Sequence, residues 1–198
     1  MHNPIIQHMK RFADISESDV DTIASCLKPI TVKKKGFLLK EGQVCKSAFF
    51  VQEGCLRLFF INEKGVEQIT QFAIENWWVA DYMSFGNQKP SPFYIQAVEN
   101  TEVVALDYLA QENLLRELPQ LERYFRVVLQ KALAASQLRI KYLYGFSKEE
   151  GYQHFISHFP EFVQRIPQYM LASYLNFTPE YLSEMRKKQS QSLFPKPV

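Results

Sequence analysis

Residues 118–146 read LPQLERYFRVVLQKALAASQLRIKYLYGF, the longest run of unbroken helical periodicity in the chain. Its apolar positions recur at spacings of four, three, four and three, which places on one helical stripe Leu121, Phe125, Val128, Ala132 and Ala135. Pro119 suits the first turn of a helix, and Gly145 is a stop signal. We therefore expect one helix over residues 119–146.

This helix would be longer than a small domain needs. About 26 residues would span roughly 39 Å at 1.5 Å per residue, so part of the helix should contact another molecule. The small Ala132 and Ala135 would let a second helix approach closely, and an isologous two-fold pairing is the commonest way to bury such a stripe. The five stripe residues are thus predicted to form a homodimer interface. The alternative is a helix packed on its own domain.

Composition sets the broad class of the protein. With 46% hydrophobic residues, 198 residues can build one large packed domain or two small ones. The sequence has no apolar run of membrane-spanning length and no signal-peptide pattern at its amino terminus, which favours the cytoplasm and predicts no membrane partner. Cys26, Cys45 and Cys55 form neither an even disulfide set nor a C-x-x-C pair, so reduced thiols are expected.

The sequence gives little support for an enzyme. It contains no nucleophile elbow, P-loop or dinucleotide-binding glycine pattern. His154 and His158 lie one helical turn apart but lack an evident third ligand, so we predict no metal site, no catalytic residue and no cofactor. Charge is distributed unevenly, because residues 1–119 carry 12 basic and 15 acidic side chains whereas residues 120–198 carry 11 and 6. A polyanion would therefore bind the second part.

The region before the long helix has the pattern of an antiparallel β structure. Ser16 and Asp19 predict a capped helix of about ten residues, ended by Pro29. Short strand-like runs follow, separated by turn residues that include Gly42, Gly54 and Gly65, and they cover residues 30–32, 37–39, 48–51, 55–61, 66–72, 94–98 and 103–106. Such runs without intervening helices predict a sandwich, jelly roll or barrel.

One excursion interrupts these strands. Residues 76–92 read NWWVADYMSFGNQKPSP, aromatic at first, then rich in turn residues, and too long for a plain hairpin. An excursion of this kind in an all-β roll often forms a ligand pocket. The alternative is that its aromatic side chains only plug the roll, namely those of Trp77, Trp78, Tyr82 and Phe85.

The most specific signal lies near the carboxyl terminus. A capping box at Ser147 and Glu150 predicts a helix that ends before Pro160, and residues 166–188 then read IPQYMLASYLNFTPEYLSEMRKK. Here Asn176 can adopt the positive φ of a sharp turn, and Thr178 can cap a second helix. The crossing of the two helices would bury Leu171, Ala172, Leu175, Phe177, Leu182 and Met185. This spacing is typical of a helix-turn-helix that reads a DNA major groove, the alternative being an ordinary helical hairpin.

A β-rich region, one long helix and a carboxy-terminal helix-turn-helix together resemble the CRP/FNR superfamily of bacterial transcription regulators. The resemblance implies an α+β protein in three parts: a cyclic nucleotide-binding-like antiparallel β-roll (jelly roll, cupin-like) over residues 1–118, a dimerisation helix over 119–146 and an all-α helix-turn-helix domain over 147–198. It also implies a homodimer in which an effector in the roll reorients the two DNA-binding domains. Duplex DNA, a second copy, a small-molecule effector and RNA polymerase are the partners it suggests.

The effector pocket departs from the pattern of this family. Ala80-Asp81 and Ser91-Pro92 stand where the family's cassette has Gly-Glu and Arg-Ser, so the arginine that pairs with a cyclic phosphate is missing. We therefore predict a pocket formed by Trp77, Trp78, Ala80, Asp81, Tyr82 and Ser91 that does not take cyclic AMP. The amino-terminal cysteine cluster of the iron-sulfur members is missing too.

The predicted DNA-binding helix also departs from the pattern of this family. Its groove-facing residues would be Thr178, Glu180, Ser183 and Glu184, with Glu184 in place of the family's base-reading arginine. Backbone phosphates would be gripped one turn later by Arg186, Lys187 and Lys188. Pro195 and Pro197 argue against a full β-wing. The favoured function is an effector-controlled dimeric transcription regulator, and the alternative is a ligand-sensing or protein-contact module with a vestigial helix-turn-helix.

Overall fold

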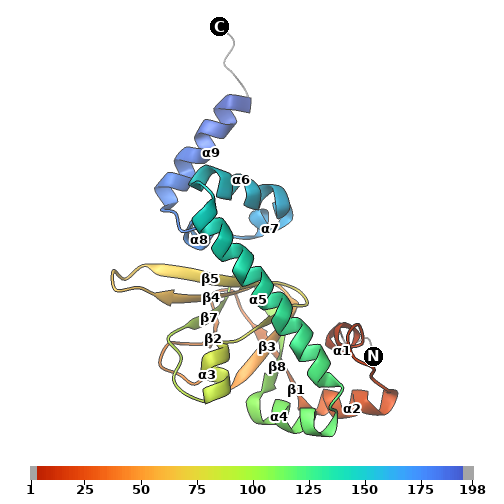
Figure 1. Cartoon of the computed structure of the whole chain (residues 1–198). Coiled ribbons are helices and arrows are strands. Elements are labelled where there is room, and N and C mark those ends of the chain that lie inside the picture. The colour runs from red at the N-terminus through yellow and green to blue at the C-terminus, as the bar shows by residue number, and fades with distance from the viewer. Residues whose placement is uncertain (1–3, 194–198) are drawn as a thin grey trace.

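The computed structural model describes residues 4–193, without the side chains of residues 188–193. Two helices, α1 (Pro4–Met9) and α2 (Glu17–Cys26), lead into two four-stranded antiparallel sheets, together called the roll (Figure 1). One sheet has the order β1-β8-β3-β6 (Leu27–Val32, Thr101–Asp107, Ser47–Glu53, Trp78–Val79). The other has the order β2-β7-β4-β5 (Phe37–Leu39, Tyr94–Ala97, Leu56–Ile61, Glu67–Ala73). The predicted antiparallel β-roll is confirmed.

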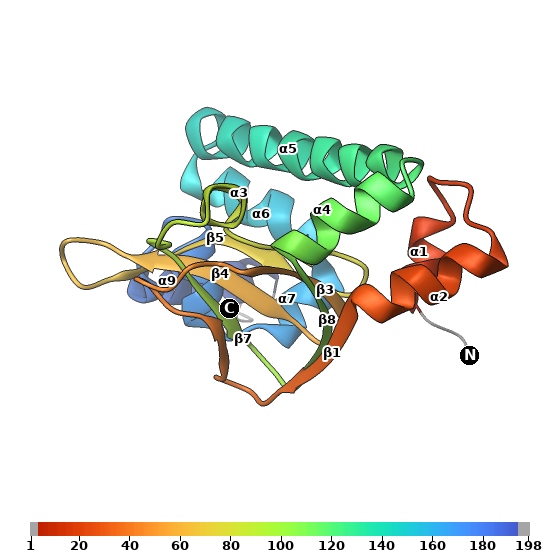
Figure 2. The ribbon, with the colours of Figure 1, turned by 90° about the horizontal axis from the view of Figure 1, so that it is seen from below.

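The remaining elements are helices. The short α3 (Tyr82–Asn87) lies between β6 and β7, and α4 (Tyr108–Glu117) follows β8. The long α5 (Leu121–Gly145) then runs along one side of the roll, with α4 near its amino-terminal end (Figure 2). Its other end leads into four further helices, together called the head: α6 (Lys148–His158), α7 (Pro160–Arg165), α8 (Gln168–Tyr174) and α9 (Pro179–Leu193).

The alternation of side chains along β4 explains why the molecule has two hydrophobic cores. Leu56 and Leu58 point between the sheets, into a core shared with α1 and the first half of α5. Phe59 points the other way, into a second core that residues of the head complete. Because successive strand residues face opposite sides, one strand can serve both cores. The head therefore packs on the outer face of the roll.

The turn at Gly54 joins β3 to β4 and requires glycine. Its φ is +99°, and a Cβ atom there would lie 2.6 Å from Thr101 Oγ1 and 2.7 Å from the Asn100 carbonyl oxygen. Both the backbone conformation and the close approach of the next segment exclude a side chain.

Several sequence predictions need correction. Helices α1, α3 and α4 were not expected, and because α4 ends at Glu117 the long helix begins at Leu121, after a turn that contains Pro119. Pro29 does not end α2, which stops at Cys26; it lies inside β1, where an edge strand tolerates its missing N–H. Pro195 and Pro197, the basis for the absent wing, lie outside the described residues.

Candidate nucleic-acid interface

Helices α8 and α9 form the predicted helix-turn-helix. Asn176 has φ +60°, and the hydroxyl oxygen of Thr178 accepts the backbone N–H of Tyr181 at 3.2 Å, which caps α9. The Phe177 N–H closes the turn on the Ala172 carbonyl oxygen at 2.8 Å. The crossing buries Leu171, Ala172, Leu182 and Met185, while Leu175 and Phe177 are half-buried. The turn residue, the cap and the apolar spacing seen in the sequence were therefore sufficient to predict this pair of helices.

The outer face of α9 is exposed and divided by charge. Thr178, Glu180, Ser183, Glu184, Arg186 and Lys187 are all exposed, whereas the side chain of Lys188 lies outside the described residues. Tyr181 faces α6 instead: its hydroxyl donates to Glu149, and Lys148 Nζ lies 4.8 Å from its ring centroid. The hydrogen bond to Glu149 raises the pKa of Tyr181. These contacts fix α9 against α6 and leave its other face open.

The residues predicted to form the effector pocket make contacts within the chain. Trp78 is buried, donates its indole N–H to the Tyr124 hydroxyl at 2.7 Å and packs on Phe50 and Phe125. Trp77 points outward and is 47% exposed, and Tyr82 is exposed as well. The excursion therefore contributes one tryptophan to the core and leaves the other at the surface.

Asp81, Ala80 and Ser91 are buried around α3. Asp81 Oδ1 caps this helix, accepting the N–H groups of Met83 at 3.1 Å and Ser84 at 3.2 Å. Its Oδ2 is buried without a hydrogen-bond partner among the described residues. The Ser91 hydroxyl accepts the Phe93 N–H at 3.0 Å. Asp81 and Ser91 thus order the loop that sequence reasoning assigned to ligand binding.

An open cavity of about 510 Å³ adjoins this region, beside β2, β3 and the loop that joins them. Its lining, which includes none of the six predicted pocket residues, consists of Leu38, Leu39, Gln43, Val44, Cys45, Lys46, Ser47 and Phe49. The Cys45 N–H donates to the Ser84 hydroxyl at 2.9 Å, which ties the cavity wall to α3. A volume of this size suits a small molecule. Sequence reasoning missed it because the 40–46 loop reads as a plain turn.

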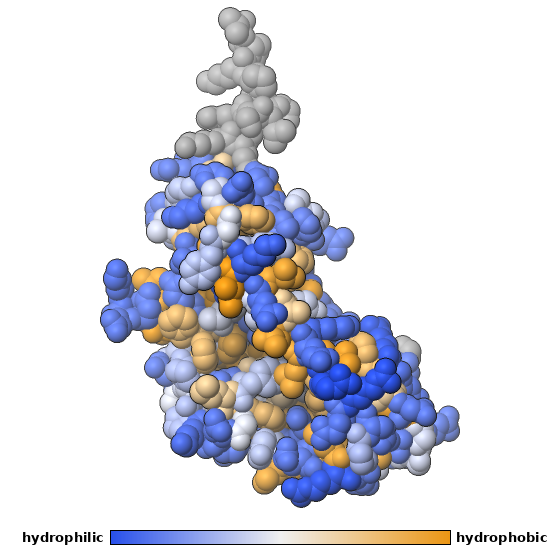
Figure 3. Space-filling model, viewed as in Figure 1, coloured by the Kyte–Doolittle hydropathy of each residue, from blue (hydrophilic) through white to orange (hydrophobic). Residues whose placement is uncertain are grey.

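The long helix carries two apolar stripes, and prediction found only one. Leu121 and Phe125 are buried in the core of their own chain, and Val128 packs against that core. Ala132 is half-buried and Ala135 is exposed. A second stripe, rotated by roughly a quarter turn at 100° per residue, is exposed and consists of Leu129, Leu133, Ile140, Leu143 and Tyr144. Apolar side chains gather among charged ones over α5 (Figure 3).

The described residues contain neither a membrane-spanning helix nor a group of metal ligands. No helix there is both long and apolar enough to span a bilayer. No group of three or more histidine, cysteine, aspartate or glutamate side chains there is arranged to hold a metal ion.

Comparisons with known proteins agree with this architecture. A family model described as the cyclic nucleotide-binding domain matches residues 29–117. The transcriptional activator protein anr of Pseudomonas aeruginosa is 30% identical over 124 residues, which cover 62% of this chain and 50% of the relative. The fumarate and nitrate reduction regulatory protein of Vibrio cholerae is 27% identical over 139 residues, 69% of this chain and 54% of the relative. The chain spans about half the length of these curated relatives.

Solved structures share the fold at low identity. FixK2 from Bradyrhizobium japonicum has a TM-score of 0.72 at 14% identity, covering 84% of this chain and 85% of that one. The c-di-GMP responsive global regulator CLP of Xanthomonas campestris has a TM-score of 0.73 at 14% identity, covering 89% and 93%. In its matching domain, its sequence relatives and its arrangement of roll, long helix and head, the chain is similar to proteins of the CRP/FNR superfamily.

Proposed function

We propose that this protein is a dimeric, cytoplasmic transcription regulator that binds duplex DNA through α9 and is controlled by a small molecule in the roll. The observation that carries the proposal is the helix-turn-helix, whose second helix presents an exposed polar face while Met170, Leu171 and Ala172 of the first are buried. The relatives with matching sequence are named as transcriptional regulators, which supports the same function and argues against an enzyme. RNA polymerase is a further partner that we propose for this function.

DNA contact should be made mainly through the phosphate backbone. Glu180 and Glu184 lie on the groove side, where their negative charges would be repelled by the DNA phosphates. A carboxylate can nevertheless accept a hydrogen bond from a cytosine amino group. Arg186 and Lys187 lie one turn later, where they can reach phosphate. Lys188 follows them in the sequence and is assigned the same role.

The effector should differ from a cyclic nucleotide. Most of the cavity lining is apolar or neutral, and its one cationic member, Lys46, is a point charge without the bidentate geometry of arginine. The buried Arg57 is already occupied: it donates to Gln96 Oε1 at 2.6 and 2.9 Å and pairs with Glu67 at 2.5 Å. A largely apolar small molecule fits this lining better than an anion.

Two copies should pair through the exposed stripe of α5 that begins at Leu129. Its members follow one another at spacings of four, seven, three and one residues along a single side of the helix. An isologous contact would bury these side chains against their equivalents. This surface replaces the one predicted from sequence, because Leu121 and Phe125 are buried within the single chain.

Fluorescence anisotropy on duplexes tests the function. The duplexes are the region upstream of the protein's own gene and a random sequence, each titrated at several salt concentrations. Replacing Arg186 and Lys187 together with alanine should weaken binding to both duplexes and lower the salt slope by about two. Glu184→Arg should raise general affinity, since an arginine there could reach guanine O6 and N7.

The matched control replaces Lys33 and Lys34 with alanine, which removes two charges from an exposed turn of the roll. It should change neither affinity nor slope. If wild-type protein binds neither duplex at low salt, with or without candidate effectors, the protein-contact module becomes the better assignment. A selective loss on the upstream duplex with Glu184→Arg would instead make Glu184 a specific reader.

A further inference from the structure

We propose that a polar latch holds the head against the roll of its own chain, and that DNA binding requires its release. The latch is defined as Arg165 and Arg139, with the side chains and carbonyl groups they bind, and Ser173. The proposal rests on the proposed function only in its second half, because whether the head is held can be measured without DNA.

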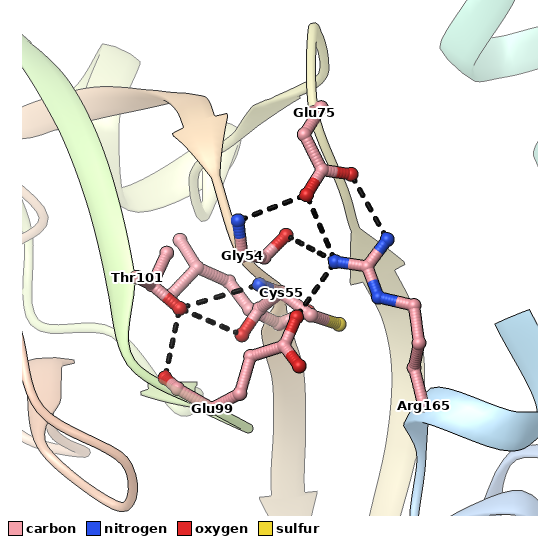
Figure 4. Close-up of polar contacts among 7 residues, drawn as sticks. Gly54, Cys55, Glu75, Glu99, Thr101 and Arg165 are labelled. Atoms are coloured by element: carbon pink, nitrogen blue, oxygen red, sulfur yellow. Dashed lines mark hydrogen bonds and ion pairs between the residues drawn. The ribbon is translucent and has the colours of Figure 1, made fainter.

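Arg165, the last residue of α7, gathers three separate turns of the roll (Figure 4). Its Nη1 donates to Glu75 Oε2 at 3.0 Å, and its Nη2 donates to Glu75 Oε1 at 2.9 Å and Glu99 Oε1 at 2.6 Å. Nη2 also donates to the Gly54 carbonyl oxygen at 3.1 Å, and Glu75 accepts the Gly54 N–H at 2.9 Å. One guanidinium therefore links the head to residues that precede it by 66 to 111 positions.

The charges of this cluster depend on one another. Burial, the largest single influence, would raise the pKa of Glu75, but the hydrogen bonds from Arg165, from its own backbone and from Gly54, together with the charge of Arg165, outweigh it and hold the pKa below its usual value. The hydrogen bonds to Glu75 and then Glu99 raise the pKa of Arg165. Their side chains remain about one third exposed (32% for Arg165, 35% for Glu75 and 34% for Glu99). Water and salt can therefore compete for these contacts, as a releasable latch requires.

A second set of contacts secures α8 to the edge of the sheet. The Ser173 hydroxyl donates to the Glu67 carbonyl oxygen at 2.7 Å and accepts the Ile69 N–H at 3.0 Å. Arg139 of α5 donates to the Ile69 carbonyl oxygen at 3.1 Å and to the Tyr174 carbonyl oxygen at 2.9 Å. Because β5 is an edge strand, these backbone groups have no neighbouring strand on that side. The first helix of the DNA-binding motif occupies their place.

This docking competes with DNA for α8 and for positive charge. The first helix of a helix-turn-helix crosses the DNA backbone, yet here α8 packs on β5, with Tyr174 and Phe162 of the head against Phe72. Carboxylates of the roll already neutralise Arg165. Since roll and head belong to one chain, the roll acts on the head at a high effective concentration. The roll is thus an internal competitor for DNA.

Arg165→Gln tests the latch, because it removes the charge and the fork and leaves a shorter, neutral polar side chain. Without DNA, amide hydrogen exchange at residues 67–73 and 166–178 should become about tenfold faster, and the radius of gyration from X-ray scattering should increase. Affinity for the upstream duplex should rise about threefold or more at low salt. Arg123→Gln, an exposed arginine of α5, is the matched control and should change none of these.

A charge swap guards against a simple folding defect. Arg165→Glu combined with Glu75→Arg should restore part of the protection that Arg165→Glu alone removes. Unchanged hydrogen exchange and scattering in Arg165→Gln would overturn the latch. An opened head with unchanged DNA affinity would overturn its inhibitory role. If neither wild type nor Arg165→Gln binds DNA but the head still opens, the proposed function fails while the latch stands.

Discussion

The two halves of α5 have equally apolar sequences and opposite environments. Leu121, Tyr124 and Phe125 lie in the core of the chain, where the Tyr124 hydroxyl accepts from Trp78 and contacts His8 Nδ1 at 2.9 Å. Beyond Val128 the helix exposes large side chains, with Leu133 60% and Tyr144 89% exposed. Burial in the first half requires only one chain, whereas burial in the second requires a partner. Substitutions in the two halves should therefore affect different equilibria.

The largest effect is expected in the first half. Leu121→Ala removes a fully buried side chain and should lower the free energy of unfolding by about 3 kcal/mol, with self-association unchanged. Urea denaturation at low protein concentration measures the first quantity and sedimentation the second. Leu133→Ala, the matched control, should cost less than about 0.5 kcal/mol of unfolding free energy. Equal costs at the two positions would contradict the contrast between the halves.

The second half should control assembly. Leu133→Asp places a charge on the exposed stripe and should raise the dimer dissociation constant about 100-fold, equivalent to roughly 2.7 kcal/mol. Sedimentation velocity over a range of concentrations measures this. Ala134→Asp places the same charge on a different side of the helix and serves as the control. A wild-type protein that is already monomeric at micromolar concentration would refute the interface.

A smaller effect concerns the hydroxyl at the centre of the first half. Tyr124→Phe leaves the buried Trp78 N–H without its acceptor and should cost about 1.5 kcal/mol of unfolding free energy. Tyr144→Phe removes a hydroxyl from the exposed half and should have no measurable effect. Thermal or urea denaturation of the two variants compares them directly. Similar losses would mean that Tyr124 acts through its ring alone.

The smallest effect should be a pH dependence due to His8. Burial, followed by the charges of Arg11 and Lys131, lowers the pKa of His8 from its ordinary 6.5. The folded state thus favours the neutral ring, so its contribution to stability is complete above pH 6.5 and is lost as pH falls from there toward the lower folded pKa. Denaturation of wild type and His8→Gln across this window should show a steeper decline for wild type. Parallel curves for the two proteins would exclude His8 as the source of the pH dependence.

Local signals in the sequence predicted local structure well. The capping boxes at Ser16 and Ser147 are present, and Asn176 has the positive φ expected of its turn. Helix α4 was missed although Asp107, a favourable N-cap residue type, precedes it; in the structure this side chain makes no cap. Pro119 led to a predicted start of the next helix that is two residues too early. Caps and turn residues therefore predict a single helix, but they do not predict which elements lie next to it.

The parts that could not be predicted depend on distant segments. The stripe of Leu121 and the stripe of Leu133 look alike in sequence, and only the position of the roll distinguishes them. Arg165 binds Glu75 and Glu99, which lie 90 and 66 residues away in the sequence, and no periodic pattern predicts such a contact. The cavity depends in the same way on how β2 and β3 approach each other, and no alternation of residues along one strand encodes that distance.

The placement of Pro29 and Ser173 also bears on solubility. Outer strands of a sheet are templates for pairing with other chains, and both of the longer ones here carry a residue that disfavours it. In β1 the proline offers no N–H, and in β5 the serine hydroxyl occupies the N–H and carbonyl that another strand would use. A protein whose head leaves the roll would uncover the edge of β5. The freed form should therefore be the more prone to aggregate, unless DNA or a partner engages it quickly.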